Sequence, residues 1–514
     1  MTLDYLIIGA GPGGLQLAAL MDRDGRDYLV LEAGAAPGSF FATYPRHRTL
    51  ISINKVWTGS DDPEFNLRAD WNSLLTDDPA LLFKHYSKRY FPAAGDFVRY
   101  LADFARDLRV SYDTRVTRIA YDGEVFTVEA GETEFRARRV IVATGVSRMY
   151  VPPIEGAELA ERYDTVSVDP DDFTDQRVLI VGKGNSAFET ADALVETAAV
   201  IHVAGPHSVR LAWQSHYVGH LRAVNNNFLD TYQLKSQNAV LDGTIERIVR
   251  RDDGGFRIDF RYARTVESIR HIDYDRIILC TGFRFDASVF DDSARPRLVI
   301  NDRFPEQTPA YESVNVPGLY FAGTLTQQRD FKKSTGGFIH GFRYGARALH
   351  RILGARHHGT PWPATPVEPT PEAITDAIIA RINRTSALWQ QFAVLADVVT
   401  VDGGGARYLE EVPVAYLRDN GLGPDVFALV TTLEYGADHD QGDPFDITVP
   451  RIAENDPAAA HDASYLHPVV RAYRGGQVVA EHHLAENLEN EWNLPAVHQQ
   501  PLALFIKGVL ADAH

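Results

Sequence analysis

Two glycine-rich segments, one at the N-terminus and one near residue 180, constrain the fold of this chain most strongly. In the first, an apolar run over residues 4–9 ends in glycine, residues 14–24 carry apolar side chains at helical spacing, and a second apolar run covers residues 28–32. The second segment repeats this order, from RVLIV through GKGNSAFETADAL to AAVIHVAG. A strand, a glycine turn, a helix and a second strand form a βαβ unit. The sequence therefore predicts an α/β protein with two Rossmann-like dinucleotide-binding domains.

The first segment has the spacing Gly9-x-Gly11-x-x-Gly14, with Glu32 at the end of the following strand. Glycines at these positions allow a tight turn and let backbone N–H groups approach a pyrophosphate, which the positive end of the helix attracts. Glu32 is placed to accept hydrogen bonds from the hydroxyls of an adenosine ribose. We assign this site to FAD.

The second segment has the spacing Gly182-x-Gly184-x-x-Ala187, again between a strand and a helix. No Asp or Glu ends its second strand, which runs into His207 and then Arg210. A missing acid and nearby cations favour a 2′-phosphate over a free 2′-hydroxyl. We therefore expect a preference for NADPH over NADH, unless Arg210 is an ordinary solvated surface residue.

Strands that end in Thr-Gly follow both units, as ATG at residues 143–145 and CTG at residues 280–282. Two dinucleotide folds in tandem bring two cofactors face to face, and hydride transfer from nicotinamide to flavin is the reaction that this arrangement serves. We expect a discontinuous FAD domain of residues 1–165 and 300–358, with an NADPH domain of residues 166–299 inserted.

A helix is expected over residues 338–353, where apolar residues recur on one helical face. Gly336 and Gly337 at its start would point amide groups at the flavin and stabilise the reduced ring, or the helix merely packs. The full set of residues expected to bind the cofactors is Gly9, Gly11, Pro12, Gly14, Glu32, Ser39, Phe40, Val116, Ala143, Thr144, Gly145, Gly182, Gly184, Asn185, Ser186, Ala187, His207, Arg210, Gly282, Gly323, Thr324, Gly336 and Gly337.

The C-terminal third has a different organisation. Residues 359–371 are rich in proline and predict a stiff linker. Residues 372–514 mix helix and strand signals and predict an additional α+β region.

Charge and cysteine content exclude several function classes. The chain has 514 residues and a net charge of −18, which disfavours nucleic acid and anionic membrane surfaces as partners. Its one cysteine, Cys280, excludes an intramolecular disulfide, a CxxC pair and a multi-thiolate metal site. The histidines lack the HExxH pattern, so we expect no metal. No basic stretch precedes the first apolar run, so we expect a cytoplasmic protein; an oligomer stays open.

The order GAGPGG, ATG, GKGNSA, CTGF resembles that of the flavin-containing monooxygenases and the wider flavoproteins with two dinucleotide-binding domains. Longer stretches resemble the FAD-dependent oxidoreductase domain-containing family, to which the endoplasmic-reticulum flavoprotein associated with degradation belongs. These stretches are residues 39–55, 64–75, 216–226, 229–236, 334–351, 393–399 and 408–411, together with LHPVV at residue 466.

The two resemblances imply different chemistries. The second family is implicated in supplying reducing power to disulfide reduction, but this chain has no dithiol to relay electrons. The flavin-containing monooxygenases oxygenate substrates through a C4a-hydroperoxyflavin, and their Asn motif near the flavin is similar to Asn54 followed by Lys55. A side-chain amide can both donate to and accept from a peroxide, although Asn54 alternatively caps a loop. Lys332 and Lys333 face the flavin, an anionic substrate or solvent.

The sequence thus favours an NADPH-dependent FAD monooxygenase that transfers oxygen from O₂ to a small nucleophilic substrate, such as an amine. Asn54, Lys55 and Lys333 are its expected catalytic residues. One alternative is an NADPH:acceptor reductase or oxidase that acts on a disulfide or a quinone. Another is a flavoprotein scaffold whose C-terminal region binds a partner.

Overall fold

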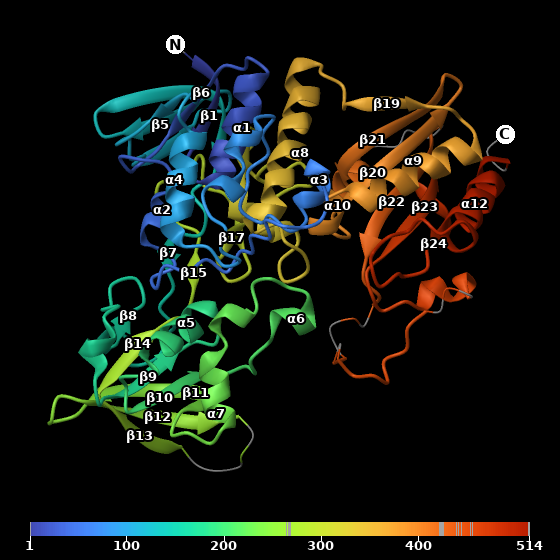
Figure 1. Cartoon of the computed structure of the whole chain (residues 1–514). Coiled ribbons are helices and arrows are strands. Elements are labelled where there is room, and N and C mark those ends of the chain that lie inside the picture. The colour runs from blue at the N-terminus through green and yellow to red at the C-terminus, as the bar shows by residue number, and fades with distance from the viewer. Residues whose placement is uncertain are drawn as a thin grey trace.

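Three large sheets organise the described part of the chain (Figure 1). The computed structural model describes residues 2–511, except for 264, 266–268, 421–425, 438, 440, 441, 444, 453 and 455. Two sheets have the strand order of a dinucleotide-binding fold, and the third is antiparallel.

The first sheet has the order β3-β2-β1-β6-β5-β4, and a late strand, β18, pairs with β6. Its strands are β1 (Thr2–Ile8), β2 (Tyr28–Leu31), β3 (Val110–Ser111), β4 (Arg118–Tyr121), β5 (Phe126–Ala130), β6 (Thr133–Val142) and β18 (Leu319–Phe321). Strands β3, β2, β1 and β6 run parallel, and the chain steps from β1 to β2 on one side and to β6 on the other. The crevice at the carboxyl ends of β1 and β6 is the position at which such sheets bind ligands.

Helices α1 (Pro12–Arg23) and α8 (Ile339–His358) cover one face of this sheet (Figure 1). Alternation along β1 explains this packing, because Tyr5 and Ile7 face the core shared with both helices, whereas Leu6 and Ile8 face a separate core. Helix α8 extends to His358, beyond the expected residue 353, and Gly359 ends it in a left-handed conformation with φ of 63°.

The second sheet has the order β13-β12-β11-β10-β9-β14-β8. Its strands are β8 (Glu161–Arg162), β9 (Arg177–Val181), β10 (Val200–Gly205), β11 (Ala239–Arg250), β12 (Phe256–Tyr262), β13 (Arg270–Tyr274) and β14 (Arg276–Leu279). Strands β11, β10, β9 and β14 are parallel, so β9 and β14 border the switch point here. Helices α5 (Asn185–Leu194), α6 (Ala212–Ser215) and α7 (Asn227–Gln233) belong to this part.

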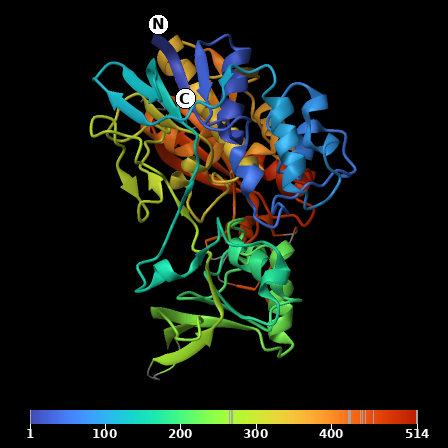
Figure 2. The same cartoon turned by 90° about the vertical axis from the view of Figure 1, so that its left-hand side faces the viewer.

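Two chain segments connect the first and second sheets (Figure 2). They pair with each other where β7 (Arg148–Met149) lies antiparallel to β15 (Phe283–Arg284). The chain therefore leaves the first part and returns to it through one narrow two-stranded junction.

The third sheet is antiparallel, with the order β19-β21-β20-β22-β23-β24. Its strands are β19 (Ala364–Val367), β20 (Leu395–Asp402), β21 (Gly405–Pro413), β22 (Phe427–Glu434), β23 (His467–Arg474) and β24 (Gln477–His483). The helices around it are α9 (Pro371–Arg384), α10 (Ala387–Gln390), α11 (Val414–Asn420) and α12 (Gln500–Ala511).

The expected linker at residues 359–371 is therefore partly wrong. Residues 364–367 form β19, which pairs with β21 at the edge of the third sheet. Pro366 is compatible with an edge strand, since an edge residue needs no N–H for a second neighbour.

Short elements complete the described chain. They are α2 (Ser39–Thr43), α3 (Pro63–Asn66), α4 (Ala94–Phe104), β16 (Leu298–Val299), β17 (Phe304–Pro305), the single-turn helices Pro79–Leu81, Phe83–His85, Ala157–Leu159, Pro170–Phe173, Ala223–Asn225, Gly323–Arg329 and Pro457–Asp462, and a π-helix at Pro495–Gln499. Among the helices of residues that the structure describes, none is long and apolar enough to cross a membrane.

Candidate active site

A cavity of about 380 Å³ lies between the first and second sheets and is lined from both. It contains backbone from the turns after β1, β6 and β18, and side chains from the start of α5. The predicted residues that line it are Gly11, Pro12, Phe40, Ala143, Thr144, Gly145, Asn185, Ser186, Gly323, Thr324 and Gly337. The structure thus brings about half of the predicted cofactor residues to one cavity.

Three helices begin at this cavity. Their N-cap residues are Gly11 for α1, Gly184 for α5 and Phe338 for α8, and in the described structure none of the three supplies a side-chain hydrogen bond to its helix. The first-turn N–H groups of such helices carry partial positive charge and bind anionic groups such as phosphate. The cavity is therefore suited to phosphate-bearing ligands.

The glycines of the first turn have separate steric roles. A Cβ on Gly14 would lie 2.1 Å from the carbonyl oxygen of Gly9, and one on Gly13 would lie 2.4 Å from the Cα of Gly323. These residues let α1 approach β1 and the turn after β18. A Cβ on Gly11 would meet no described atom within 4 Å, so Gly11 faces open space in the cavity.

Glu32 lies at the carboxyl end of the first βαβ unit, as predicted, and is buried. One carboxylate oxygen accepts a hydrogen bond from the Ala10 amide at 2.7 Å, and the other accepts from the Gly34 amide and the Ser39 hydroxyl. A carboxylate offers about four acceptor positions, so Glu32 keeps capacity for a hydroxyl. Ser39 contacts Glu32 and does not line the cavity among the described residues.

The turn of the second unit packs tightly, since a Cβ on Gly182 would lie 2.1 Å from the Cys280 carbonyl oxygen. Lys183, in the same turn, forms an ion pair with Asp242 and donates to the His207 carbonyl oxygen at 2.9 Å. Asp242 lies on β11, level with Gly205 at the end of β10. The sequence pattern predicts an acid only at the end of β10, so it did not reveal Asp242 on the neighbouring strand.

Several predicted cofactor residues lie away from the cavity wall. His207 and Arg210 are exposed. Asn185 lines the cavity, but its amide is occupied by the 219–225 loop, where its oxygen accepts from the Arg222 amide at 2.9 Å. The Gly336 amide donates to Asp330 at 2.7 Å, which contradicts its expected orientation toward the flavin. The others outside the described lining are Gly9, Gly14, Val116, Gly182, Gly184, Ala187 and Gly282.

The three expected catalytic residues do not meet at the cavity. Asn54 is buried, and its amide nitrogen donates to the Ser87 carbonyl oxygen at 2.8 Å, in line with the loop-capping alternative. Lys55 is exposed. Lys333 lines a second cavity of about 610 Å³ between the loop before α8 and the third sheet, together with Lys332. Neither lysine is among the described residues that line the first cavity.

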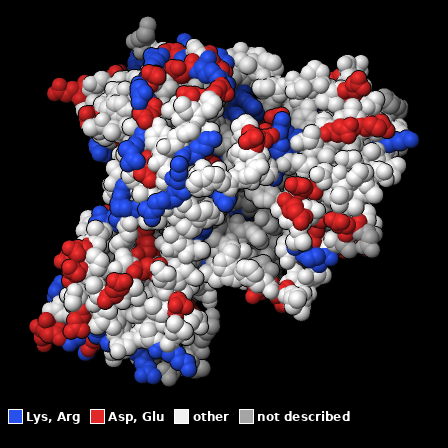
Figure 3. Space-filling model, viewed as in Figure 1, with Lys and Arg blue, Asp and Glu red and all other residues white. Residues whose placement is uncertain are grey.

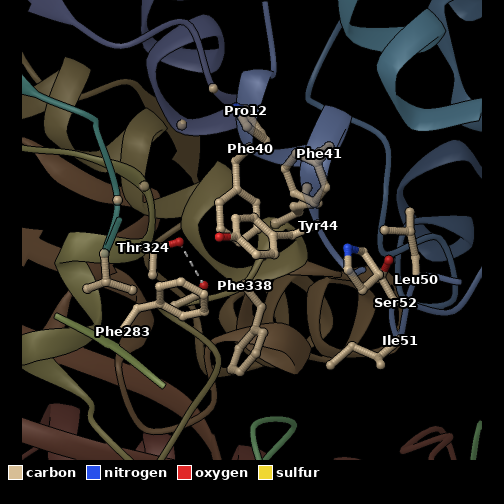
Figure 4. Close-up of a pocket in the computed structure, with 18 of the residues that line it drawn as sticks. Pro12, Phe40, Phe41, Tyr44, Leu50, Ile51, Ser52, Phe283, Thr324 and Phe338 are labelled. Atoms are coloured by element: carbon tan, nitrogen blue, oxygen red, sulfur yellow. Dashed lines mark hydrogen bonds between the residues drawn. The ribbon is translucent and has the colours of Figure 1, made fainter. Parts of the chain in front are cut away.

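Sequence reasoning missed an aromatic wall of the cavity. The rings of Phe40, Tyr44 and Phe283 gather on one side (Figure 4), with centroids 4.8 Å apart for Phe40–Tyr44 and 5.2 Å for Tyr44–Phe283. Tyr163 stacks on Tyr44 at 5.8 Å. On the floor, the Thr324 hydroxyl donates to the Gly337 carbonyl oxygen at 3.2 Å (Figure 4). Apolar rings exclude water from the space that they enclose.

Two titratable side chains of the lining also escaped prediction. Burial raises the pKa of Glu189 to about 7, although the hydrogen bond from the Tyr163 hydroxyl lowers it. Burial lowers the pKa of His340 well below its usual value, and Arg343 and Arg222 lower it further. Glu189 therefore exchanges a proton near neutral pH, while the imidazole of His340 stays neutral. Glu189 follows the second glycine turn and His340 lies within residues 334–351, but only the fold could place their side chains at one cavity.

A model of the pyridine nucleotide-disulphide oxidoreductase family matches residues 6–323. The chain belongs to this family. It is 40% identical to FAD-dependent oxidoreductase domain-containing protein 2 of Mus musculus, over 99% of this chain and 84% of the mouse protein. The predicted family resemblance is thereby confirmed.

Solved structures confirm the predicted fold. A flavin-containing monooxygenase from Stenotrophomonas maltophilia has a TM-score of 0.54 at 20% identity, covering 69% of this chain and 98% of that one. A bacillithiol disulfide reductase from Bacillus cereus has a TM-score of 0.53 at 19% identity, covering 70% of this chain and 100% of that one.

This pyridine nucleotide-disulphide oxidoreductase has one cysteine, and Cys280 is buried at the carboxyl end of β14. Burial raises the pKa of its thiol, which disfavours the reactive thiolate. Reduction of a disulfide through a dithiol of this chain is therefore not available.

Proposed function

We propose that the protein is an NADPH-dependent FAD monooxygenase that transfers oxygen to a small substrate. The observation that carries the proposal is the single cavity onto which both dinucleotide-binding turns open, with three helix N-termini at its wall. We also propose the domain limits 1–165 with 300–358 for FAD and 166–299 for NADPH.

The residues of the first part fit FAD. The open space at Gly11 admits a pyrophosphate against the N-terminus of α1, and Glu32 is placed for a ribose hydroxyl. The turns at Ala143–Gly145 and Gly323–Thr324 would border the ring system. When bound, FAD accepts a hydride from a nicotinamide and passes electrons to oxygen or to another acceptor.

The aromatic wall and the isolated thiol support oxygen transfer over disulfide reduction. Phe40, Tyr44 and Phe283 place apolar ring surface beside the proposed ring system, which would limit the access of water there during oxygen transfer. Glu189 holds or releases a proton at neutral pH at this wall. Because the chain has no second thiol beside Cys280, direct transfer from the flavin is the remaining path.

The test is anaerobic reduction of the FAD-loaded protein by NADPH, followed by rapid mixing with oxygenated buffer. Bleaching of the flavin, and then a transient near-ultraviolet absorbance before the oxidised spectrum returns, is the expected result. The measurement is repeated with candidate amines and sulfides present, because some monooxygenases need bound substrate. Direct return to the oxidised spectrum under every condition favours the reductase or oxidase, and no bleaching at all contradicts the NADPH assignment.

The preference for NADPH is tested at the exposed Arg210. Arg210→Ala should raise KM for NADPH about fivefold, as expected for loss of one charge-assisted phosphate contact, and leave KM for NADH nearly unchanged. Arg250→Ala, at an exposed arginine of the same sheet, is the control. Equal effects on both nucleotides would remove Arg210 from the phosphate site.

A further inference from the structure

Arg222 carries a largely buried positive charge that no carboxylate of the described residues pairs with. Its Nη1 atom is buried and has no hydrogen-bond partner within the described structure. Burial lowers the pKa of the guanidinium to about 10, and Tyr90 raises it slightly. Acidic side chains gather at several places on the face shown in Figure 3, and the chain has 69 of them. The absence of a described acid at Arg222 is therefore not explained by composition.

Such an arrangement is costly unless something binds there. A buried charge without a partner loses its hydration and gains no compensating attraction. Arginine keeps its charge under these conditions, so the cost is not relieved by deprotonation. An anionic ligand would supply the missing partner.

His340 presents a second unsatisfied group in the same place. Its side chain is 1% exposed and lines the cavity, and neither ring nitrogen has a partner among the described residues. The imidazole stacks on Trp71 with centroids 4.1 Å apart, and the Arg222 guanidinium lies 5.0 Å from the centroid of the Trp71 ring. Trp71 therefore connects the buried cation to the cavity wall.

Both sheets of the dinucleotide-binding parts contribute to this cluster. His340 is in the first turn of α8, and Trp71 follows the short helix α3. Arg222 belongs to the 216–226 loop, and its amide is held by Asn185 at the start of α5. Val218 of the same loop lines the cavity. The loop thus carries the guanidinium to Trp71, behind His340 of the cavity lining, although Arg222 is not itself one of the described lining residues.

We propose that Arg222 and His340 bind the carboxylate of the substrate, so that the protein acts on a small organic acid. A guanidinium fork matches the two oxygens of a carboxylate, and a neutral imidazole donates one further hydrogen bond. This inference rests on the proposed function and narrows its substrate class from nucleophiles in general to those that carry a carboxylate.

The test is calorimetric titration of the FAD-loaded protein with benzoate and 3-phenylpropionate, each compared with its uncharged primary amide. A flavin difference spectrum, recorded in the same titration, reports binding beside the ring. At least one carboxylate should bind at least tenfold more tightly than its amide. Arg222→Met should remove this difference, whereas Arg115→Met, at an exposed arginine, should leave it unchanged.

His340→Phe keeps a ring against Trp71 and removes both nitrogens. Loss of one hydrogen bond should weaken carboxylate binding about fivefold and amide binding less.

Arg222→Met also has a test that needs no ligand. Removal of an unpaired buried charge should leave the thermal midpoint of the variant equal to or above that of the wild type, so misfolding would itself contradict the inference.

The outcomes separate this inference from the proposed function. If NADPH reduces the flavin but no carboxylate binds better than its amide, the inference fails alone. If Arg222-dependent carboxylate binding is found without reduction by NADPH, the proposed function fails alone. If Arg222→Met weakens binding of NADP⁺ but not of the carboxylate, Arg222 serves the nucleotide and the inference is overturned.

Discussion

At Gly11, one added side chain should prevent cofactor binding without preventing folding. A Cβ there meets no described atom within 4 Å, so Gly11→Val should fold, yet its side chain would occupy the proposed pyrophosphate position. We expect apoprotein with a flavin content below about a tenth of wild type. The measurement is the ratio of flavin to protein absorbance. Gly95→Val, also at an open position in the first turn of a helix, is the control and should remain yellow.

Glu189 should make stability depend on pH. Its pKa is raised from 4.5 to about 7 in the folded protein, so the folded state binds the proton more tightly than the unfolded state. The resulting stabilisation is full below about pH 4.5 and is lost as the pH rises through about 7, by at most about 3 kcal/mol.

In Glu189→Gln, the thermal midpoint should therefore fall less between pH 5 and pH 8 than it does in the wild type. Asp330 and Asp192, whose pKa values burial also raises, keep part of the slope, so the difference between variant and wild type is the quantity to measure. Glu196→Gln, at an exposed position just beyond α5, should reproduce the wild-type curve. If the thermal midpoint depends on pH in Glu189→Gln as it does in the wild type, the Glu189 carboxyl is hydrated in the folded protein.

Some residues of the candidate site could be predicted from the sequence, and others could not. Gly11, Gly14 and Glu32 were predictable because turn chemistry and the acid after the second strand are local patterns. His340 and Arg222 were not, because they are far apart in the chain and meet only through packing. Lys333 was misplaced since helical spacing says nothing about the direction of the loop before α8.

At the scale of elements, a buried charge network joins α8, α9 and β21. Glu411 on β21 is buried and contacts Arg347 and Arg351 of α8 and Arg381 of α9, with Arg351 at 3.3 Å and Arg381 at 3.4 Å. Burial alone would raise the pKa of Glu411, but the three arginines hold it below its usual value. The carboxylate therefore neutralises cations from two helices at once.

Glu411→Gln should destabilise the protein by about 3–5 kcal/mol, because it removes the carboxylate that pairs with the half-buried Arg347 and Arg351, whereas Arg381 keeps Asp397 at 3.0 Å. The thermal midpoint should fall by several degrees. Glu410→Gln, at the half-exposed neighbour that pairs with Arg381 at 3.3 Å, should cost about 1 kcal/mol or less. Equal losses for the two variants would mean that the network contributes through Arg381 alone.

The Rossmann-like character of the first two sheets followed from the glycine motifs, whereas the third sheet did not. Residues 372–514 gave mixed signals, and the role of β19 was hidden by its prolines. An edge strand tolerates proline that an inner strand excludes, so composition alone could not distinguish it from a linker.

At the scale of the whole molecule, the third sheet is not a separable module. Tyr344 of α8 belongs to the core of the third sheet, and the Arg68 guanidinium donates to the carbonyl oxygens of Ile382 at 2.7 Å and Thr385 at 2.9 Å. Truncation after Pro363 would expose Tyr344 and Arg68 and would remove β19.

We expect the fragment of residues 1–363 to be insoluble or free of flavin, measured by size-exclusion chromatography with absorbance at the flavin band. The full chain prepared in parallel is the control. A soluble, yellow fragment that NADPH reduces would contradict this expectation and favour the scaffold alternative.

The buried thiol of Cys280 has a practical consequence for studying motion. Maleimide and spin-label reagents attack thiolates that solvent reaches, so the native protein should give no background. A cysteine pair placed at the exposed positions Arg115 and Glu196 would then take two probes, one on each side of the β7–β15 junction. Distances between those probes, with and without nucleotide, would report directly whether the second part swings as a rigid body about that two-stranded hinge.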